Sequence, residues 1–279
     1  MENLGYYNGK TGLINELSIP ITDRAFYFGD GVYDAVMCRN NIPYLLSEHI
    51  ERLYHNCKLL DINPPICRKE CCELIEDLVK RVDGEEKFVY FHISRGSGIR
   101  NHAYDCQQGN ICVMIKQQRV DNVYEKMDTI TQRDIRYQLC NIKTLNLLPS
   151  VLTAQASVKA GCEEAILHRD GIVTECSHSN VSILKNGELI THPANCYILP
   201  GVTRAHLISC AMENNIPVKQ REYTLRELFD ADEIIVTSSS KMARGVKTID
   251  GIAVGGRDEE RLAILRDTLH GNYIRATQI

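Results

Sequence analysis

The chain has 279 residues and a mass of 31.6 kDa, which is enough for one large domain or two modest ones. Its 44% hydrophobic and 24% charged residues exclude a disordered or fibrous chain. The 32 basic and 36 acidic side chains give a net charge of −4, so neither nucleic acid nor an anionic membrane is an expected partner. No stretch reaches the roughly 20 apolar residues that a transmembrane helix needs.

The 12 cysteines have no C-x-x-C spacing. The tightest group, Cys67, Cys71 and Cys72, falls in a segment whose apolar spacing predicts one face of a helix. Buried free thiols act as small hydrophobic side chains, which favours packing over metal binding. Because the N-terminus lacks a basic patch followed by an apolar run, we expect a reduced, cytoplasmic protein with no metal site. The alternative is a non-catalytic redox or metal-binding protein built on these cysteines.

Short strands, tight turns and two helices are predicted for the first part of the chain. The turns at 8–9 and 39–41 predict β-hairpins. The remaining elements are a helix at about 47–60, the cysteine-rich helix ending near 82, strands at 87–94 and 111–116, and a polar loop at 95–110 between these strands.

The polar stretch at 117–122 is the best candidate for a domain boundary. We therefore expect a small N-terminal domain at 1–118, a linker at 119–122 and a larger C-terminal domain at 123–279. The second domain is predicted to contain a helix at 149–160, hairpins turning at 169–171 and 186–187, a helix after Gly201, a strand at 233–236 and a helix at 258–270. This mixed order indicates an α+β fold rather than regular βαβ winding. A G-x-G-x-x-G dinucleotide motif is absent.

Two residues could act on an aldehyde cofactor. Lys143 is enclosed by apolar neighbours, and its pattern alone favours a surface lysine that keeps its ammonium in water. The other interpretation is a desolvated amine that attacks a carbonyl carbon and holds an aldehyde as an imine. Glu175 follows a predicted hairpin strand. It is either a solvated strand-end carboxylate or an acid that keeps a pyridine nitrogen protonated.

Other residues could bind anions. The helix that begins near Thr203 offers its N-terminal amides to a phosphate, or is an ordinary helix start. The serines at 238–240 form a polar turn or face an anion. Arg52 lies off the apolar stripe of its helix, as a solvated side chain or a phosphate clamp. Arg100 and His102, in a glycine-rich loop, are solvated or bind a substrate carboxylate.

These segments together resemble the fold-type IV family of pyridoxal-phosphate enzymes and, within it, the bacterial D-amino-acid aminotransferases. The resemblance covers nearly the whole chain, and matches in order over this length are far more specific than any single one. The matching segments are DRAFYFGDGVYD at 23–34, SEHIERLY at 47–54, the Arg-x-His loop, IKTLNLL at 142–148, EAILHRDGIVTECSHSN at 164–180, THPANCYILPGVTR at 191–204 and VTSSS at 236–240.

The resemblance implies a role for each candidate. It places the imine-forming lysine at Lys143, the carboxylate on the pyridine nitrogen at Glu175, and an active-site tyrosine at Tyr33. Arg100 and His102 then complete a trap for the substrate carboxylate. The remaining cofactor contacts, to the phosphate and the ring, are implied at Arg52, Leu199, Val202, Thr203, Ser238 and Ser239.

The same resemblance implies two α+β domains with pyridoxal 5′-phosphate between them. It also implies a homodimer in which part of the carboxylate trap comes from the second subunit. The expected reaction is ping-pong transamination of D-amino acids, with D-alanine and 2-oxoglutarate giving pyruvate and D-glutamate. The alternatives within the family are an L-branched-chain aminotransferase and an aminodeoxychorismate lyase. The Arg-x-His loop favours D-substrates over both.

Three residues depart from the family's pattern. His178 falls in a run that is more often all serine, which indicates a supporting role rather than a cofactor contact. Asp34 follows Tyr33 where the family has glutamate, which shortens an acidic group near the site. Lys241 directly follows the serine run and changes the local charge. None of the three removes a group that the chemistry requires.

Overall fold

The computed structural model describes residues 1–105 and 108–278, and it divides into two compact units. Unit 1 contains Met1–Arg119, Ile142–Asn146 and Arg275–Ile279, and unit 2 contains Val120–Asn141 and Leu147–Ile274. Residues 106 and 107 of the expected polar loop lie outside the described residues. Within the described ranges, no helix is long and apolar enough to cross a membrane.

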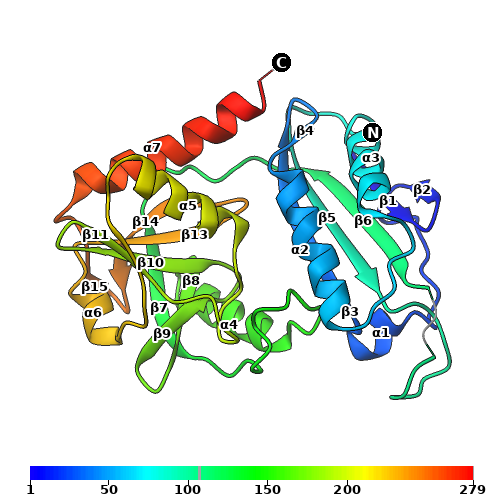
Figure 1. The fold of residues 1–279 in the computed structure, drawn as a ribbon, viewed down its shortest axis with the longest axis horizontal. Coiled ribbons are helices and arrows are strands. Elements are labelled where there is room, and N and C mark those ends of the chain that lie inside the picture. Colours follow the sequence, from blue (N-terminus) through cyan, green and yellow to red (C-terminus); the bar gives the residue numbers. More distant parts are fainter. Residues whose placement is uncertain (106–107, 279) are drawn as a thin grey trace. The chain divides into compact units, whose positions relative to one another are not determined.

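Unit 1 is built on an antiparallel sheet of six strands in the order β2-β1-β6-β5-β3-β4 (Figure 1). Helix α2 packs on β3 and α3, and Leu53, Ile75 and Val89 are fully buried in the core between them. In chain order the elements are β1 (Asn3–Tyr7), β2 (Lys10–Gly12), α1 (Arg24–Phe28), β3 (Gly31–Arg39), β4 (Ile42–Pro43), α2 (Leu46–Leu59), α3 (Arg68–Val79), β5 (Glu86–Ser94) and β6 (Asn110–Gln117).

Both hairpins predicted for this unit are confirmed. The β1–β2 turn has Asn8 at φ 45° and Gly9 at φ 90°, and the β3–β4 turn has Asn40 at φ 53° and Asn41 at φ 62°. Two-residue hairpin turns with positive φ at both positions match the twist of the strands, and asparagine and glycine tolerate that conformation best. The register of the β1–β2 and β3–β4 pairs is therefore set locally by these turns.

Unit 2 contains a mixed sheet in the order β12-β11-β10-β13-β14-β7-β8-β9, with β15 paired to β14. The pairs β7–β8, β7–β14 and β11–β12 are parallel, and the other pairs are antiparallel, which confirms the α+β class. In chain order the elements are β7 (Met127–Arg133), α4 (Leu148–Lys159), β8 (Glu164–Arg169), β9 (Ile172–Cys176), β10 (Asn180–Lys185), β11 (Glu188–Thr191), α5 (Val202–Glu213), β12 (Val218–Gln220), α6 (Leu225–Phe229), β13 (Glu233–Ser238), β14 (Met242–Ile249), β15 (Ile252–Ala253) and α7 (Glu259–Ala276).

The segment Ile142–Asn146, which was expected in the C-terminal domain, groups with unit 1 instead. The main-chain N–H of Tyr33 donates to the Lys143 oxygen at 2.9 Å, and the Leu145 N–H donates to the Gly31 oxygen at 3.0 Å. The segment thus runs beside the start of β3. These hydrogen bonds, rather than sequence proximity, decide which unit carries Lys143.

Candidate active site

Lys143 and Tyr33 face each other within unit 1. The Lys143 Nζ lies 4.5 Å from the centroid of the Tyr33 ring, and that ring stacks on Tyr90 with centroids 5.5 Å apart. Among residues 1–105 and 108–278, no carboxylate lies within ion-pair distance of this amine, and the side chain is half-buried. Lys143 and the stacked tyrosines thus form one cluster beside the start of β3.

A buried carboxylate next to Tyr33 holds Arg52 in place. Arg52 donates from Nε and from a terminal nitrogen to the two oxygens of Asp34, at 2.9 and 2.8 Å. His49 Nδ1 lies 2.7 Å from the same carboxylate. Burial alone would raise the pKa of Asp34, but Arg52 and His49 outweigh it and hold this pKa well below its usual range. The shorter acidic side chain noted in the sequence therefore still orients the candidate phosphate-binding arginine.

His49 was not a candidate from the sequence, because a histidine on a helix gives no signal of its own. Burial is the main cause that lowers its pKa, and the nearby Arg52 and Lys143 act in the same direction against the opposing effect of Asp34. His49 is therefore a neutral hydrogen-bond partner of Asp34 at neutral pH.

Arg100 and His102 lie on an exposed loop of unit 1, against the ring of Phe28 in α1. The Arg100 guanidinium carbon is 5.2 Å from the centroid of this ring, and the His102 ring centroid is 5.1 Å from it. The buried Arg24 donates to main-chain oxygens of the loop at 2.7 and 3.4 Å. The structure thus brings the two side chains together, and in the described part of the chain neither has a hydrogen bond, ion pair or ring contact with Lys143.

Glu175 is buried in unit 2, with 5% of its surface exposed. The Arg136 guanidinium donates to its Oε1, while Asn180 Nδ2 at 2.8 Å and the Leu199 N–H at 3.0 Å donate to its Oε2. Arg136 is also paired with Asp134 at 2.8 Å. Donors of this kind stabilise the ionised carboxylate. Glu175 is therefore a preorganised anion rather than a solvated strand-end side chain.

Helix α5 begins three residues after Leu199, whose N–H contacts Glu175. Gly201 occupies its N-cap position and, having no side chain, makes no cap hydrogen bond to the first amides of the helix. A Cβ on Gly201 would lie only 2.1 Å from the Asn180 Oδ1, so this close approach requires glycine. Val202 and Thr203, each 8% exposed, form the first turn. The segment that donates to Glu175 through Leu199 thus leads directly into the N-terminus of α5.

The end of β13 carries the serines that the sequence singled out. Asn180 pairs with Thr237 across β10 and β13, and α5 packs on β13. The Thr237 Oγ1 is buried without a hydrogen-bond partner among the described residues. Ser238 and Ser239 follow it and are half-buried, and the Ser238 Oγ accepts from the Lys241 N–H at 3.1 Å. A buried hydroxyl without a partner calls for a further polar group at this edge of the sheet.

Sequence reasoning missed Arg136, Asp134 and Asn180. Arg136 lies on a connection after β7 and meets Glu175 across 39 residues. No local pattern marks that contact, because an arginine in a polar connection is ordinarily solvated. Asn180 lies inside a matched segment but received no role of its own.

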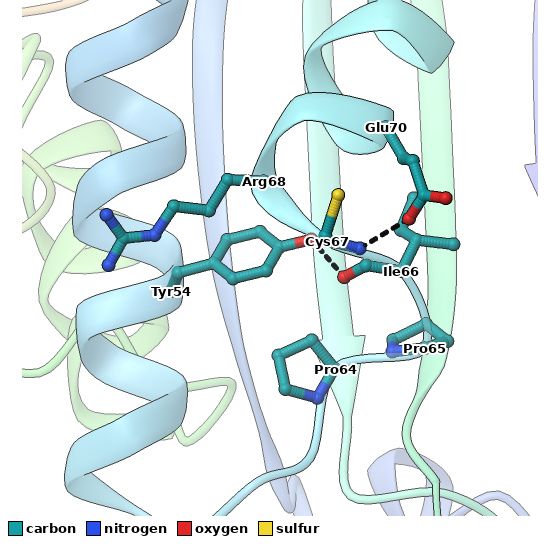
Figure 2. Close-up of a pocket in the computed structure, with 7 residues that line it drawn as sticks. All are labelled: Tyr54, Pro64, Pro65, Ile66, Cys67, Arg68 and Glu70. Carbon is teal, nitrogen blue, oxygen red and sulfur yellow. Dashed lines mark hydrogen bonds between the residues drawn. The ribbon is translucent and has the colours of Figure 1, made fainter.

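A pocket of about 470 Å³ lies elsewhere in unit 1, where α2 faces the start of α3 (Figure 2). The Tyr54 hydroxyl donates to the Ile66 oxygen at 2.7 Å, and the Cys67 N–H donates to Glu70 at 2.7 Å. None of the residues expected to bind the cofactor or the substrate lines this pocket. Its full lining is Tyr54, Pro64, Pro65, Ile66, Cys67, Arg68 and Glu70.

Comparison with known proteins gives a family match over most of the chain. Residues 31–249 match the family described as amino-transferase class IV. The chain is 37% identical over 245 residues to the D-alanine aminotransferase of Listeria monocytogenes, covering 86% of this chain and 85% of that protein.

Solved structures show the same fold. The branched-chain amino acid aminotransferase of Escherichia coli is similar with a TM-score of 0.89 at 20% identity, covering 100% of this chain and 97% of that one. The branched-chain aminotransferase of Thermoproteus uzoniensis with norvaline has a TM-score of 0.84 at 22% identity, covering 98% and 96%. At these identities the structural matches establish the fold alone. Together with the family match and the sequence relative, they establish that the chain belongs to the amino-transferase class IV family.

Proposed function

We propose that this chain transaminates D-amino acids with pyridoxal 5′-phosphate, transferring the amino group to a 2-oxo acid. The observation that carries the proposal is the arrangement around Glu175, where a buried, ion-paired carboxylate accepts a hydrogen bond from Leu199, just before the start of α5. The D-alanine aminotransferase from Listeria monocytogenes supports D-alanine as a donor, and we propose 2-oxoglutarate as an acceptor. A solved branched-chain amino acid aminotransferase of the same fold is complexed with N-(5′-phosphopyridoxyl)-L-glutamate, which supports the choice of cofactor.

The residues of unit 2 fit this cofactor. Pyridoxal phosphate carries an aromatic nitrogen at one side and a phosphate at the other, which need an anion and a set of amide or hydroxyl donors. Glu175 supplies the anion. The N-terminal amides of α5 and the Thr237 Oγ1, which has no hydrogen-bond partner among the described residues, are suitable donors for phosphate oxygens. A negatively charged ligand here would also complement the positive end of the helix dipole.

Each candidate residue then has a defined task. When bound, the cofactor supplies an aldehyde carbon and a ring that withdraws electrons from the substrate Cα. Lys143 would bind the aldehyde carbon and, once released, its Nζ would move a proton from the substrate Cα. Glu175, supported by Arg136, would hold the proton at the ring nitrogen. Leu199 would pack on the ring, and the phosphate would be held by Arg52, Val202, Thr203, Ser238 and Ser239.

We assign the substrate carboxylate to Tyr33, Arg100 and His102. Because Lys143 can take a proton from one face only, the position of the carboxylate decides which enantiomer reacts. Arg100 and His102 are exposed, so we propose that this loop serves the site of a second subunit in a homodimer. Ile99, next to Arg100, is 91% exposed, and such an apolar side chain favours a subunit contact.

Further surface and redox features support the same proposal. On α4, Leu148, Val151, Leu152 and Val158 are each more than half exposed, which is consistent with burial against a second copy.

Every described cysteine is a free thiol, which suits a reducing compartment, and we propose the cytoplasm. Light scattering of the purified protein tests the dimer, and a mass at or near 31.6 kDa would exclude it.

Exposure of the purified protein to separate enantiomers tests the reaction. We expect D-alanine, but not L-alanine, to convert the bound cofactor to its amine form, as followed by absorbance. Addition of 2-oxoglutarate should reverse the conversion and yield D-glutamate. Conversion by L-amino acids alone would identify a branched-chain type of enzyme. Formation of pyruvate from aminodeoxychorismate, with no 2-oxo acid consumed, would identify a lyase.

A further inference from the structure

The buried carboxylate of Glu164 collects an unusual number of hydrogen bonds in unit 2. Glu164 begins β8 and is fully buried. Its Oε1 accepts from the N–H of Ser177 at 3.2 Å and from the Ser177 hydroxyl, and its Oε2 accepts from the Ser179 hydroxyl at 3.0 Å. The Lys241 Nζ lies 3.6 Å from Oε2. A buried carboxylate needs such a cation, because an unpaired buried charge is costly.

His178 and Lys241, two of the departures noted in the sequence, meet at this carboxylate. The Lys241 Nζ lies 2.8 Å from His178 Nε2, and the His178 Nδ1 lies 2.7 Å from the Ser177 Oγ. An ammonium can only donate, so Nε2 must accept, and the single hydrogen of the neutral imidazole is on Nδ1. The hydrogen bonds then run in one direction, from Lys241 to His178, to Ser177 and to Glu164, and the 3.6 Å ion pair closes the ring.

This ring of hydrogen bonds fixes the turn that lies between Glu175 and Asn180 in the chain. Ser177 and Ser179 are both tied to Glu164, and the Cys176 N–H donates to the Ser179 oxygen at 2.7 Å. Asn180, the next residue, donates to Glu175 at 2.8 Å and to the Leu199 oxygen at 2.9 Å. The position of the turn therefore determines where the Asn180 side chain lies. This side chain donates both to Glu175 and to Leu199, which precedes α5.

We propose that His178 and Lys241 are positioning residues that act as one unit, holding Glu164 and the 177–179 turn so that Asn180 orients Glu175. This inference rests on the proposed function of Glu175. It goes beyond it in assigning a joint role to two residues that depart from the serine-rich pattern of the family. Neither residue needs to touch the substrate for this role, because both act through the turn.

The tautomer of His178 gives a spectroscopic test that is independent of activity. In the cofactor-free protein labelled with ¹⁵N-histidine, the His178 imidazole should show a protonated Nδ1 and an unprotonated Nε2 at about pH 8, where an imidazole is ordinarily neutral. The His178→Ser variant assigns the resonance, and the exposed His55 provides a comparison within the same spectrum. A proton on Nε2 of His178 would overturn the hydrogen-bond ring.

A double-mutant cycle tests the joint role. We expect Lys241→Met to lower kcat for D-alanine about tenfold, the factor for one lost hydrogen bond to a charged group, with KM changed less than about twofold. His178→Ser should lower kcat by a similar factor, and the double variant should lose no more than the worse single variant. Lys241→Arg, which keeps the charge, should retain most of kcat, and the exposed control His55→Ser should match the wild type.

The affinity of the cofactor-free protein for pyridoxal phosphate, measured by fluorescence titration, should weaken among these variants in the same order as their kcat. If the losses of kcat in the two single variants multiplied in the double variant, the joint role would be overturned. Single variants with a lower melting temperature but an unchanged kcat would overturn it as well. A wild-type protein that fails to transaminate D-alanine would instead refute the proposed function. The tautomer and the cofactor titration would then still decide whether the ring exists and what it supports.

Discussion

Replacement of Glu175 by glutamine probes the electrostatics of the site with almost no change in shape. Glu175 accepts from Arg136 at one oxygen and from Asn180 and Leu199 at the other. A glutamine amide has one acceptor oxygen and one N–H₂ donor. If its oxygen keeps Asn180 and Leu199, its N–H₂ group must face the Arg136 guanidinium. Two donors then oppose each other where the wild type has an ion pair.

The expected loss of stability follows from the loss of the hydrogen bond between Arg136 and Glu175. A hydrogen bond to a charged group contributes about 1.5–3 kcal/mol. The free energy of unfolding of the cofactor-free Glu175→Gln variant should therefore fall by about 2 kcal/mol, measured by urea denaturation. Removal of the D-alanine Cα proton, followed by stopped-flow absorbance, should slow by about 100-fold or more, because no anion remains to hold the ring-nitrogen proton. The exposed control Glu260→Gln should change neither quantity. Equal unfolding midpoints and equal rates for Glu175→Gln and the wild type would refute this reasoning.

Three further changes test other parts of the account. A Cβ on Gly201 would lie 2.1 Å from Asn180 Oδ1, so Gly201→Ala should displace Asn180 and weaken cofactor binding at least about tenfold in a fluorescence titration; unchanged affinity would exclude this contact as a determinant. Arg100→Ala should raise KM about tenfold for neutral and dicarboxylic D-amino acids alike. An unchanged KM would show that Arg100 is a solvated side chain that does not bind the substrate. Burial lowers the pKa of His92 from 6.5 to about 4, so its contribution to stability is present above pH 6.5 and is lost as the pH falls to 4. His92→Gln should remove up to about 3 kcal/mol of this pH dependence in urea titrations, and an identical acid response in both proteins would contradict it.

Local features of the fold were predictable from the sequence because short-range chemistry determines them. The Asn8-Gly9 turn requires positive φ at both positions, and these two residues adopt it at low cost. Strand β7 was not anticipated, because Met127–Arg133 alternates only weakly between apolar and polar residues, and its parallel neighbours β8 and β14 come later in the chain. The placement of Lys143 beside Tyr33 in unit 1 likewise depends on main-chain hydrogen bonds that no local pattern encodes.

The candidate site likewise combines residues that the sequence indicated with long-range contacts that it did not. Lys143 and Glu175 stood out only through a resemblance that spans the chain, since each alone was compatible with a solvated side chain. The partners that give Glu175 its charge environment were missed, because Arg136 is 39 residues away. The contact between His178 and Lys241 spans 63 residues. Such pairs arise from strand order, which composition and periodicity do not reveal.

The covalent attachment of the cofactor tests the central claim most directly. The protein should be loaded with pyridoxal phosphate, reduced with borohydride and digested, and the modified peptide identified by mass spectrometry. The account predicts that the label is on Lys143, and that the Lys143→Ala variant is neither labelled nor active with D-alanine. A label on another lysine, such as Lys241, or the absence of any label in the wild type would contradict it.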